Sequence, residues 1–210
     1  MIIDRKLVIV DTGLSNLQSI FWACQNLSTH SVRLLSSPGQ LDPESVVIIP
    51  GTGSFGAGMN ALKTLGIAAE LINHHKSGGP LVGICLGMQL LFESSAESVG
   101  ERGLSLIEGG AQLLDRQSEP VPNLGWSSAV LSGPETAILT EESEGDYYFV
   151  HSYALSVEGF RGTVLEATHG VTNFAAAIHL PEKRIFATQF HPEKSSKHGL
   201  QLLRKAVSIV

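Results

Sequence analysis

The chain has 210 residues, of which 43% are hydrophobic and 16% charged, and its formal net charge is −6. A chain of this length can bury one substantial core, so we expect a single domain over residues 1–210. The acidic balance and the lack of a long Lys/Arg run argue against nucleic-acid binding. Apolar stretches such as Val46–Pro50 are far shorter than the roughly 20 residues of a membrane span.

Charged residues 4–6 interrupt the only apolar stretch near the start of the sequence, and no signal-peptide pattern is visible there. We therefore expect a soluble protein of the cytoplasm. Because that compartment keeps thiols reduced, Cys24 and Cys85 are not expected to form a disulfide, and each needs its own interpretation.

Three apolar runs in the first half of the chain predict strands, at Leu7–Val10, Val46–Ile49 and Leu81–Ile84. Helical patterns separate them, including one over Asn16–Leu27 whose apolar face makes Cys24 a buried hydrophobe. This alternation predicts a parallel sheet covered by helices on both faces, with a functional site at the carboxyl ends of the strands.

The second half of the chain has the texture of a strand-rich region. Short alternating segments occur at Ser127–Leu131, Tyr147–Val150, Thr163–Thr168, Phe174–His179 and Ile185–Gln189. Ser196 then predicts the cap of a last helix, with Leu200, Leu203, Val207 and Val210 on one face.

Cys85 lies in the segment Gly83-Ile84-Cys85-Leu86-Gly87, between an apolar strand and a helical pattern over Met88–Phe92. This is the context of a nucleophile elbow, in which glycines permit a strained backbone and the helix start favours a thiolate. Taken alone, the segment is equally compatible with a cysteine that only fills space.

His191-Pro192-Glu193 follows the last predicted strand. In an extended chain, residues two apart project to the same side, so the carboxylate can orient the imidazole. Alone, such a tripeptide is more typical of a surface turn. Together with Cys85 it supplies the nucleophile, base and orienting group of covalent acyl transfer.

An oxyanion site is suggested at Pro50-Gly51-Thr52-Gly53, where glycines would let the Thr52 peptide reorient, although an ordinary glycine turn is the alternative. His74 and His75 fall near a predicted helix end, where capping is the expected role. The sequence has no HExxH or paired CxxC spacing, so neither a metal nor a cofactor is expected.

These residues resemble the class I glutamine amidotransferases, and more closely the glutaminase subunits of imidazole glycerol phosphate synthase. The resemblance extends over nearly the whole chain. It rests on Asp11-Thr12-Gly13 with Asn16-Leu17, Pro50–Gly53, Gly83–Phe92, Gly125-Trp126, Phe149–Tyr153 and Gln189–Ser195.

The resemblance implies a flavodoxin-like α/β fold, with a mostly parallel central sheet flanked by helices and additional antiparallel strands in the C-terminal half. It implies Cys85 as nucleophile, His191 as acid and base, and Glu193 as the orienting carboxylate. The implied substrate-binding residues are Gly51, Thr52, Gly53, Leu86, Gln89, Ser152 and Tyr153, and the implied partner-facing residues are Trp126, Tyr148 and Lys194.

The implied reaction hydrolyses glutamine to glutamate and ammonia through a cysteine thioester. Because the motifs span residues 50–193, little chain remains for an acceptor domain. The ammonia would pass to a (β/α)8-barrel cyclase in a heterodimer, which forms imidazole glycerol phosphate and aminoimidazole carboxamide ribonucleotide in histidine biosynthesis.

Several positions depart from the family pattern, and many of them belong to its partner-facing or activation-sensing surface. They are Thr12, Ser15, Thr52, Asn123 and Ser127, where Tyr, Gly, Val, His and Asn are usual. Two alternatives stay open: the glutaminase subunit of another synthase, including a paralogous or pyridoxal phosphate type, and a non-catalytic flavodoxin-like binding module.

Overall fold

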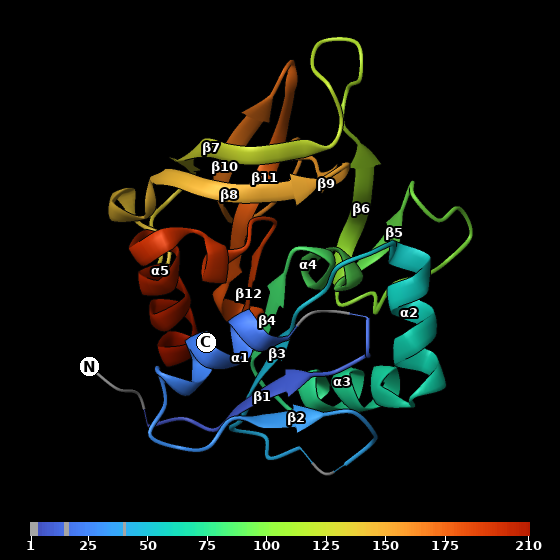
Figure 1. Ribbon diagram of the computed structural model, residues 1–210, viewed down its shortest axis with the longest axis vertical. Helices are drawn as coiled ribbons and strands as arrows, with labels where there is room; N and C mark the ends of the chain where they lie inside the picture. The colour runs from blue at the N-terminus through green and yellow to red at the C-terminus, as the bar shows by residue number, and fades with distance from the viewer. Residues whose placement is uncertain (1–3, 15–16, 40) are drawn as a thin grey trace.

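The computed structural model describes residues 4–14, 17–39 and 41–210. Its centre is a nine-stranded sheet with the order β2-β1-β3-β4-β12-β11-β10-β7-β8 (Figure 1). The first five strands in this order run parallel to one another. They are β2 (Arg33–Leu35), β1 (Leu7–Val10), β3 (Val46–Ile49), β4 (Leu81–Ile84) and β12 (Ile185–Thr188).

The other four strands extend the sheet in antiparallel fashion beyond β12. They are β11 (Thr172–Leu180), β10 (Thr163–His169), β7 (Asn123–Ser132) and β8 (Gly145–His151). A separate three-stranded sheet consists of β5 (Phe92–Ser95), β6 (Ile107–Leu113) and β9 (Tyr153–Leu155). In Figure 1 this small sheet stands beside the antiparallel half of the main sheet.

Helices cover both faces of the parallel strands, because successive residues of each strand point to opposite sides. Leu7 and Ile9 share a core with α1 (Gln18–Gln25) and α5 (Ser196–Ile209). Val8 and Val10 share the opposite core with α2 (Phe55–Thr64) and α3 (Ile67–Lys76). The short α4 (Leu86–Leu90) follows β4, and 3₁₀ turns occur at Glu141–Ser143, Pro181–Lys183 and Pro192–Lys194.

The predicted α/β architecture is confirmed, and every strand predicted from the sequence is present, mostly within one or two residues at each end. Strand β2 and the small sheet were not predicted. Strand β2 has three residues, two of them exposed, so it lacks the apolar run that identifies a strand. Cys24 is fully buried in α1, as predicted, and burial raises the pKa of its thiol to about 12.

Some helix boundaries were predicted wrongly. The helical pattern after Cys85 ends at Leu90, and Phe92 begins β5. The N-cap of α5 is Ser195 rather than Ser196, and Leu200 is exposed while Leu203 and Val207 are buried.

The predicted helix start at Asn16, and the departure at Ser15, lie outside the described residues. Within the described ranges, no helix is long and apolar enough to cross a membrane.

Candidate active site

Cys85 lies at the sharp junction between β4 and α4, with backbone angles φ 53° and ψ −112°. Non-glycine residues rarely adopt a positive φ, so this backbone is strained. Its neighbours explain why the junction is so tight. A Cβ at Gly83 would lie 2.8 Å from Cα of Met88, and one at Gly87 would lie 1.7 Å from the carbonyl oxygen of Ile49. Glycine on both sides therefore lets α4 pack directly against the ends of the strands.

His191 reaches the same place because β12 pairs in parallel with β4, which brings their carboxyl ends together. The backbone N–H of His191 donates to the carbonyl of Tyr148 on β8, at 3.0 Å. Nδ1 of His191 lies 2.8 Å from Oε1 of Glu193, and both side chains are almost completely buried.

The predicted pairing of His191 with Glu193 is thus present, but the predicted extended backbone is not. Residues Pro192–Lys194 form a 3₁₀ turn. The side chain of Ser195 stabilises this turn by donating to the carbonyl of His191, at 2.7 Å, and accepting from the backbone N–H of Tyr148, at 3.0 Å. The carboxylate therefore returns to the imidazole through a turn rather than along a strand.

The electrostatic environment of His191 favours its charged form. Burial alone lowers the pKa of the imidazole, but its interactions with the Cys85 sulfur and the Glu193 carboxylate raise the pKa to about 10. Nε2 of His191 is buried and has no hydrogen-bond partner among the described residues. This nitrogen is therefore available for proton exchange in the pocket that His191 shares with Cys85.

The two catalytic candidates open onto a small cavity of about 160 Å³. Its walls come from the loop after β3, the start of α4, the loop after β5, the end of β8 with the start of β9, and the segment after β12. The lining residues are Thr52, Gly53, Cys85, Leu86, Gln89, Glu97, Val150, His151, Ser152, Tyr153 and His191. A larger hollow of about 510 Å³ lies beside β6 and contains none of the three triad candidates.

Six of the seven predicted substrate-binding residues line this cavity, and the seventh, Gly51, packs against Leu86. A Cβ at Gly51 would lie 2.7 Å from Cβ of Leu86, so glycine allows the two loops to approach. The Thr52 hydroxyl donates to the carbonyl of Leu14, at 3.2 Å. The amide nitrogen of Gln89 donates to the carbonyl of Tyr153, at 2.8 Å, and to Oε1 of Gln189, at 2.9 Å.

Several residues of the site were not predicted as site residues. Glu97 supplies the only carboxylate among the lining residues, and its Oε2 accepts from the backbone N–H of Phe55, at 2.6 Å. Gln189 is fully buried beside Cys85, and Ser195 orders the His191 turn. Gln189 and Ser195 bound the segment that carries the family resemblance, but their side-chain roles depend on contacts with distant strands and were not assigned from it.

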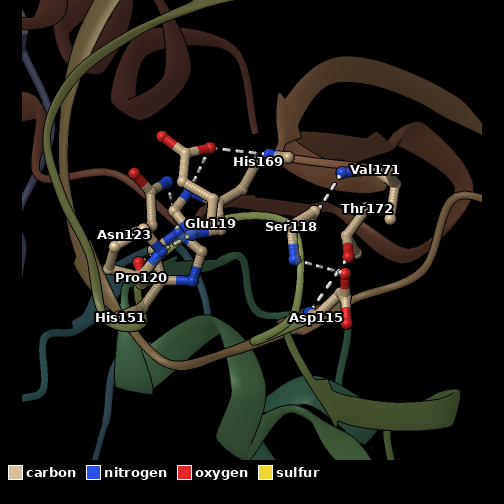
Figure 2. Close-up of polar contacts among 10 residues, drawn as sticks. Asp115, Ser118, Glu119, Pro120, Asn123, His151, His169, Val171 and Thr172 are labelled. Carbon is tan, nitrogen blue, oxygen red and sulfur yellow. Dashed lines mark hydrogen bonds and ion pairs between the residues drawn. The ribbon is translucent and has the colours of Figure 1, made fainter.

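His151 is the fourth unpredicted residue. Burial lowers its pKa to about 4, so the imidazole is neutral near neutral pH. Nδ1 donates to the carbonyl of Tyr153, at 3.0 Å, which leaves Nε2 to accept from the side-chain amide of Asn123, at 3.2 Å. Figure 2 shows Asn123 and His151 side by side.

Hydrogen bonds hold the loop that precedes β7 against the turn between β10 and β11 (Figure 2). The Glu119 carboxylate accepts from the backbone N–H of Gly170, at 2.7 Å, and the carbonyl of Pro120 accepts from Nε2 of His169, at 3.0 Å. These contacts fix the path of the chain into β7, where Asn123 lies.

The predicted partner-facing residues lie on one side of strands β7 and β8 and on the turn after His191. Trp126 and Tyr148 form an edge-to-face pair with ring centroids 6.0 Å apart. Trp126 is 53% exposed, although such a large apolar ring is normally buried. Leu124, Val130 and Val150 are also exposed on these two strands, and Lys194 is exposed on the turn.

In the described ranges, no group of three or more His, Cys, Asp or Glu side chains is arranged to hold a metal ion.

Residues 8–209 match the family model described as glutamine amidotransferase class-I. The chain is 37% identical over 207 residues to the imidazole glycerol phosphate synthase subunit HisH of Halalkalibacterium halodurans, covering 96% of this chain and 95% of that protein. It is also 37% identical over 199 residues to the HisH subunit of Aquifex aeolicus, with 94% of each chain covered.

Among solved structures, the fold is similar to PurLQS from Thermotoga maritima. The TM-score is 0.73 at 17% identity, with 97% of this chain and 98% of that chain covered. At this identity the similarity concerns the fold, which agrees with the mixed sheet described above. The family match and the extent of the sequence similarity lead to one conclusion: the chain belongs to the class I glutamine amidotransferase family, among the relatives of the HisH subunits.

Proposed function

We propose that this protein hydrolyses glutamine to glutamate and ammonia and delivers the ammonia to a synthase subunit of histidine biosynthesis. One observation carries the proposal. Cys85 and His191 face a single small cavity, and Glu193 holds the imidazole from behind at 2.8 Å. The relatives named HisH subunits of imidazole glycerol phosphate synthase support the assignment to that enzyme.

In the proposed mechanism, Sγ of Cys85 attacks the side-chain carbonyl carbon of glutamine. The carbon–nitrogen bond breaks as protonated His191 gives its proton to the departing nitrogen, so ammonia leaves and a γ-glutamyl thioester remains. His191 then removes a proton from water and the resulting hydroxide attacks the thioester. The carbon–sulfur bond breaks, so glutamate leaves and the thiolate is restored beside protonated His191. Glu193 stabilises the charged imidazole in both halves of the reaction.

The walls of the cavity offer groups suited to the rest of the substrate. Leu86 is the first residue of α4, so its N–H precedes the intrahelical hydrogen bonds and can stabilise the oxyanion together with the Thr52 peptide. Glu97 can pair with the ammonium group of glutamine. Because both hydrogens of the Gln89 amide already have acceptors, we assign Gln89 a contact through its Oε1 or an indirect role.

We propose that residues 1–210 form one domain and that a (β/α)8-barrel cyclase completes the enzyme as a heterodimer in the cytoplasm. The nine-stranded sheet runs without interruption through both halves of the chain, which supports the single domain. The pair of exposed Trp126 and half-buried Tyr148 supports a protein partner on that side, since aromatic residues are enriched at interfaces.

The deciding experiment measures glutamate release by this protein mixed with the histidine-pathway cyclase and its ribonucleotide substrate. Glutamate and imidazole glycerol phosphate should form together, and Cys85→Ala should abolish both while still binding the cyclase. Unchanged glutamate release by Cys85→Ala would eliminate the proposed triad.

The same mixture separates the alternatives. Glutamine hydrolysis without association with this cyclase would point to another synthase as the partner. Association without glutamine hydrolysis would point to a non-catalytic binding module.

A further inference from the structure

Gln189 lies beside the proposed nucleophile because of the register of two central strands. Thr188 of β12 lies opposite Ile84 of β4, and the next residue of each strand is therefore also adjacent. The backbone N–H of Cys85 donates to the carbonyl of Thr188, at 2.7 Å, and that of Gln189 donates to the carbonyl of Ala176, at 2.8 Å. Gln189 is fully buried, so its amide must find its partners within the protein.

The hydrogen bonds of this amide have only one possible direction. The carbonyl of Tyr153 can only accept, so Gln89 must turn its NH₂ group toward it, at 2.8 Å. The second hydrogen of that NH₂ group then requires an acceptor, which is Oε1 of Gln189, at 2.9 Å. Consequently the NH₂ group of Gln189 faces Sγ of Cys85, at 3.7 Å.

The other polar neighbour of the sulfur favours the protonated thiol over the thiolate. The carbonyl oxygen of Val150 lies 3.9 Å from Sγ, where it can accept from a thiol but repels a thiolate. The NH₂ group of Gln189 instead stabilises the anion. The titratable groups that line the cavity beside Cys85 are His191, His151, Glu97 and Tyr153.

We propose that Gln189 is a positioning residue that holds Sγ of Cys85 and stabilises its thiolate, and that Gln89 fixes the Gln189 amide in the required direction. The catalytic benefit of this Gln189 contact rests on the proposed glutaminase function. Its chemistry concerns the sulfur alone and can be measured without glutamine or a partner.

The test is the rate of Cys85 alkylation by iodoacetamide as a function of pH, with peptides resolved by mass spectrometry. Cys24 is fully buried and its pKa is raised to about 12, so the two thiols are distinguishable. Gln189→Met keeps the approximate length of the side chain but removes the donor. We expect the midpoint of its rate profile to move upward by about half a unit to one unit.

Gln189→Glu gives a second variant, because the carboxylate can still accept from Gln89 but presents an oxygen to the sulfur. Its midpoint should move further upward than that of Gln189→Met. Gln201→Met, at an exposed glutamine of α5, is the matched control and should leave the profile unchanged.

Two results would overturn the inference: midpoints unchanged in Gln189→Met and Gln189→Glu, or a downward shift in Gln189→Glu. If one variant does not fold, the other decides, and Gln89→Met should shift the midpoint in the same direction by removing the support of Gln189. A shifted profile in a protein that never releases glutamate would refute the proposed function and leave the role of Gln189 standing.

Discussion

Cys85, the proposed nucleophile, has a backbone conformation that L-residues avoid. At φ 53° and ψ −112°, its Cβ is the source of strain, and glycine would be free of it. Substitution of Cys85 by alanine or by glycine removes the sulfur in both cases. The difference in stability between the two variants therefore isolates the contribution of backbone strain.

We expect Cys85→Gly to be more stable than Cys85→Ala by about 1 kcal/mol, because the relief of strain exceeds the extra chain entropy that glycine loses on folding. Equilibrium urea unfolding of both variants measures the difference. Cys24 provides the control, since it lies inside α1, where glycine should instead be less stable than alanine by about 1 kcal/mol. A Cys85→Gly variant less stable than Cys85→Ala would contradict the strained geometry.

The pairing of His191 with Glu193 predicts a pH-dependent stability. The folded-state pKa of His191 is about 10, against 6.5 for an ordinary histidine. A raised pKa contributes stability that is complete below about pH 6.5 and is lost as the pH rises to about 10. The Cys85 sulfur and the Glu193 carboxylate both raise the pKa of His191, and Glu193→Gln removes the charge of the second.

We therefore expect Glu193→Gln to lower the free energy of unfolding by about 1.5 to 3 kcal/mol at pH 6, with the difference shrinking toward pH 10. Urea unfolding at pH 6, 8 and 10 measures it. Glu182→Gln, at an exposed carboxylate, should show no such trend. A difference that grows with pH would show that His191 is not stabilised in its charged form.

At this scale, sequence reasoning identifies residues whose chemistry is visible in a short segment. Cys85 lies between glycines after an apolar run, and His191 stands two residues from its carboxylate. Gln189 and Ser195 could not be recognised as site residues in this way. Gln189 depends on the register of β12 with β4, and Ser195 on the approach of β8 to the His191 turn.

Among the elements, the junction of β4 and α4 depends on the closeness of β3. A Cβ added at Gly87 would lie only 1.7 Å from the carbonyl oxygen of Ile49. The two nearest atoms are backbone atoms of Ile49, which cannot move aside as a flexible side chain could, so a side chain at position 87 would push α4 away from the sheet.

We expect Gly87→Ala to lower the free energy of unfolding by about 3 kcal/mol or more, as measured by urea unfolding. Gly100→Ala is the matched control. Its Cβ would meet open space, and its φ of 86° leaves only conformational strain, which costs about 1 to 2 kcal/mol. Equal losses in the two variants would mean that the close approach of Gly87 to Ile49 is absent.

Elements with a long apolar run could be predicted, and short or mixed ones could not. β3 and β4 are fully buried, so their β-branched residues stand out from the turns that follow. The end of the helix after Cys85 was predicted wrongly, because an apolar residue such as Phe92 fits the pattern of a helix and of a strand equally well. Its strand state is set by pairing with Ile107 on β6, which no local pattern contains.

At the scale of the whole molecule, one side of β7 and β8 carries exposed apolar side chains, among them the large ring of Trp126. Trp126 is 53% exposed and packs against Tyr148 through an edge-to-face contact. Buried aromatic residues at the centre of an interface contribute a large share of binding energy.

We expect Trp126→Ala to weaken binding to the cyclase by about 30-fold or more, which corresponds to about 2 kcal/mol. Its thermal midpoint should stay close to that of the unsubstituted protein. Trp22 is 57% exposed on α1 and serves as a control of the same size and exposure. Isothermal titration calorimetry gives both affinities, and equal weakening by Trp22→Ala would argue against β7 and β8 as the centre of the interface.

The small volume of the catalytic cavity has a practical consequence for assays. About 160 Å³ is below the range of roughly 300 to 1,000 Å³ typical of drug-sized ligands. A chromogenic γ-glutamyl anilide would have to place an aromatic ring next to Cys85, in a cavity also lined by Val150 and Gln89. We expect such surrogates to be turned over very poorly. The colour of a released aniline will therefore underestimate the glutaminase activity, and an assay that detects glutamate will be needed.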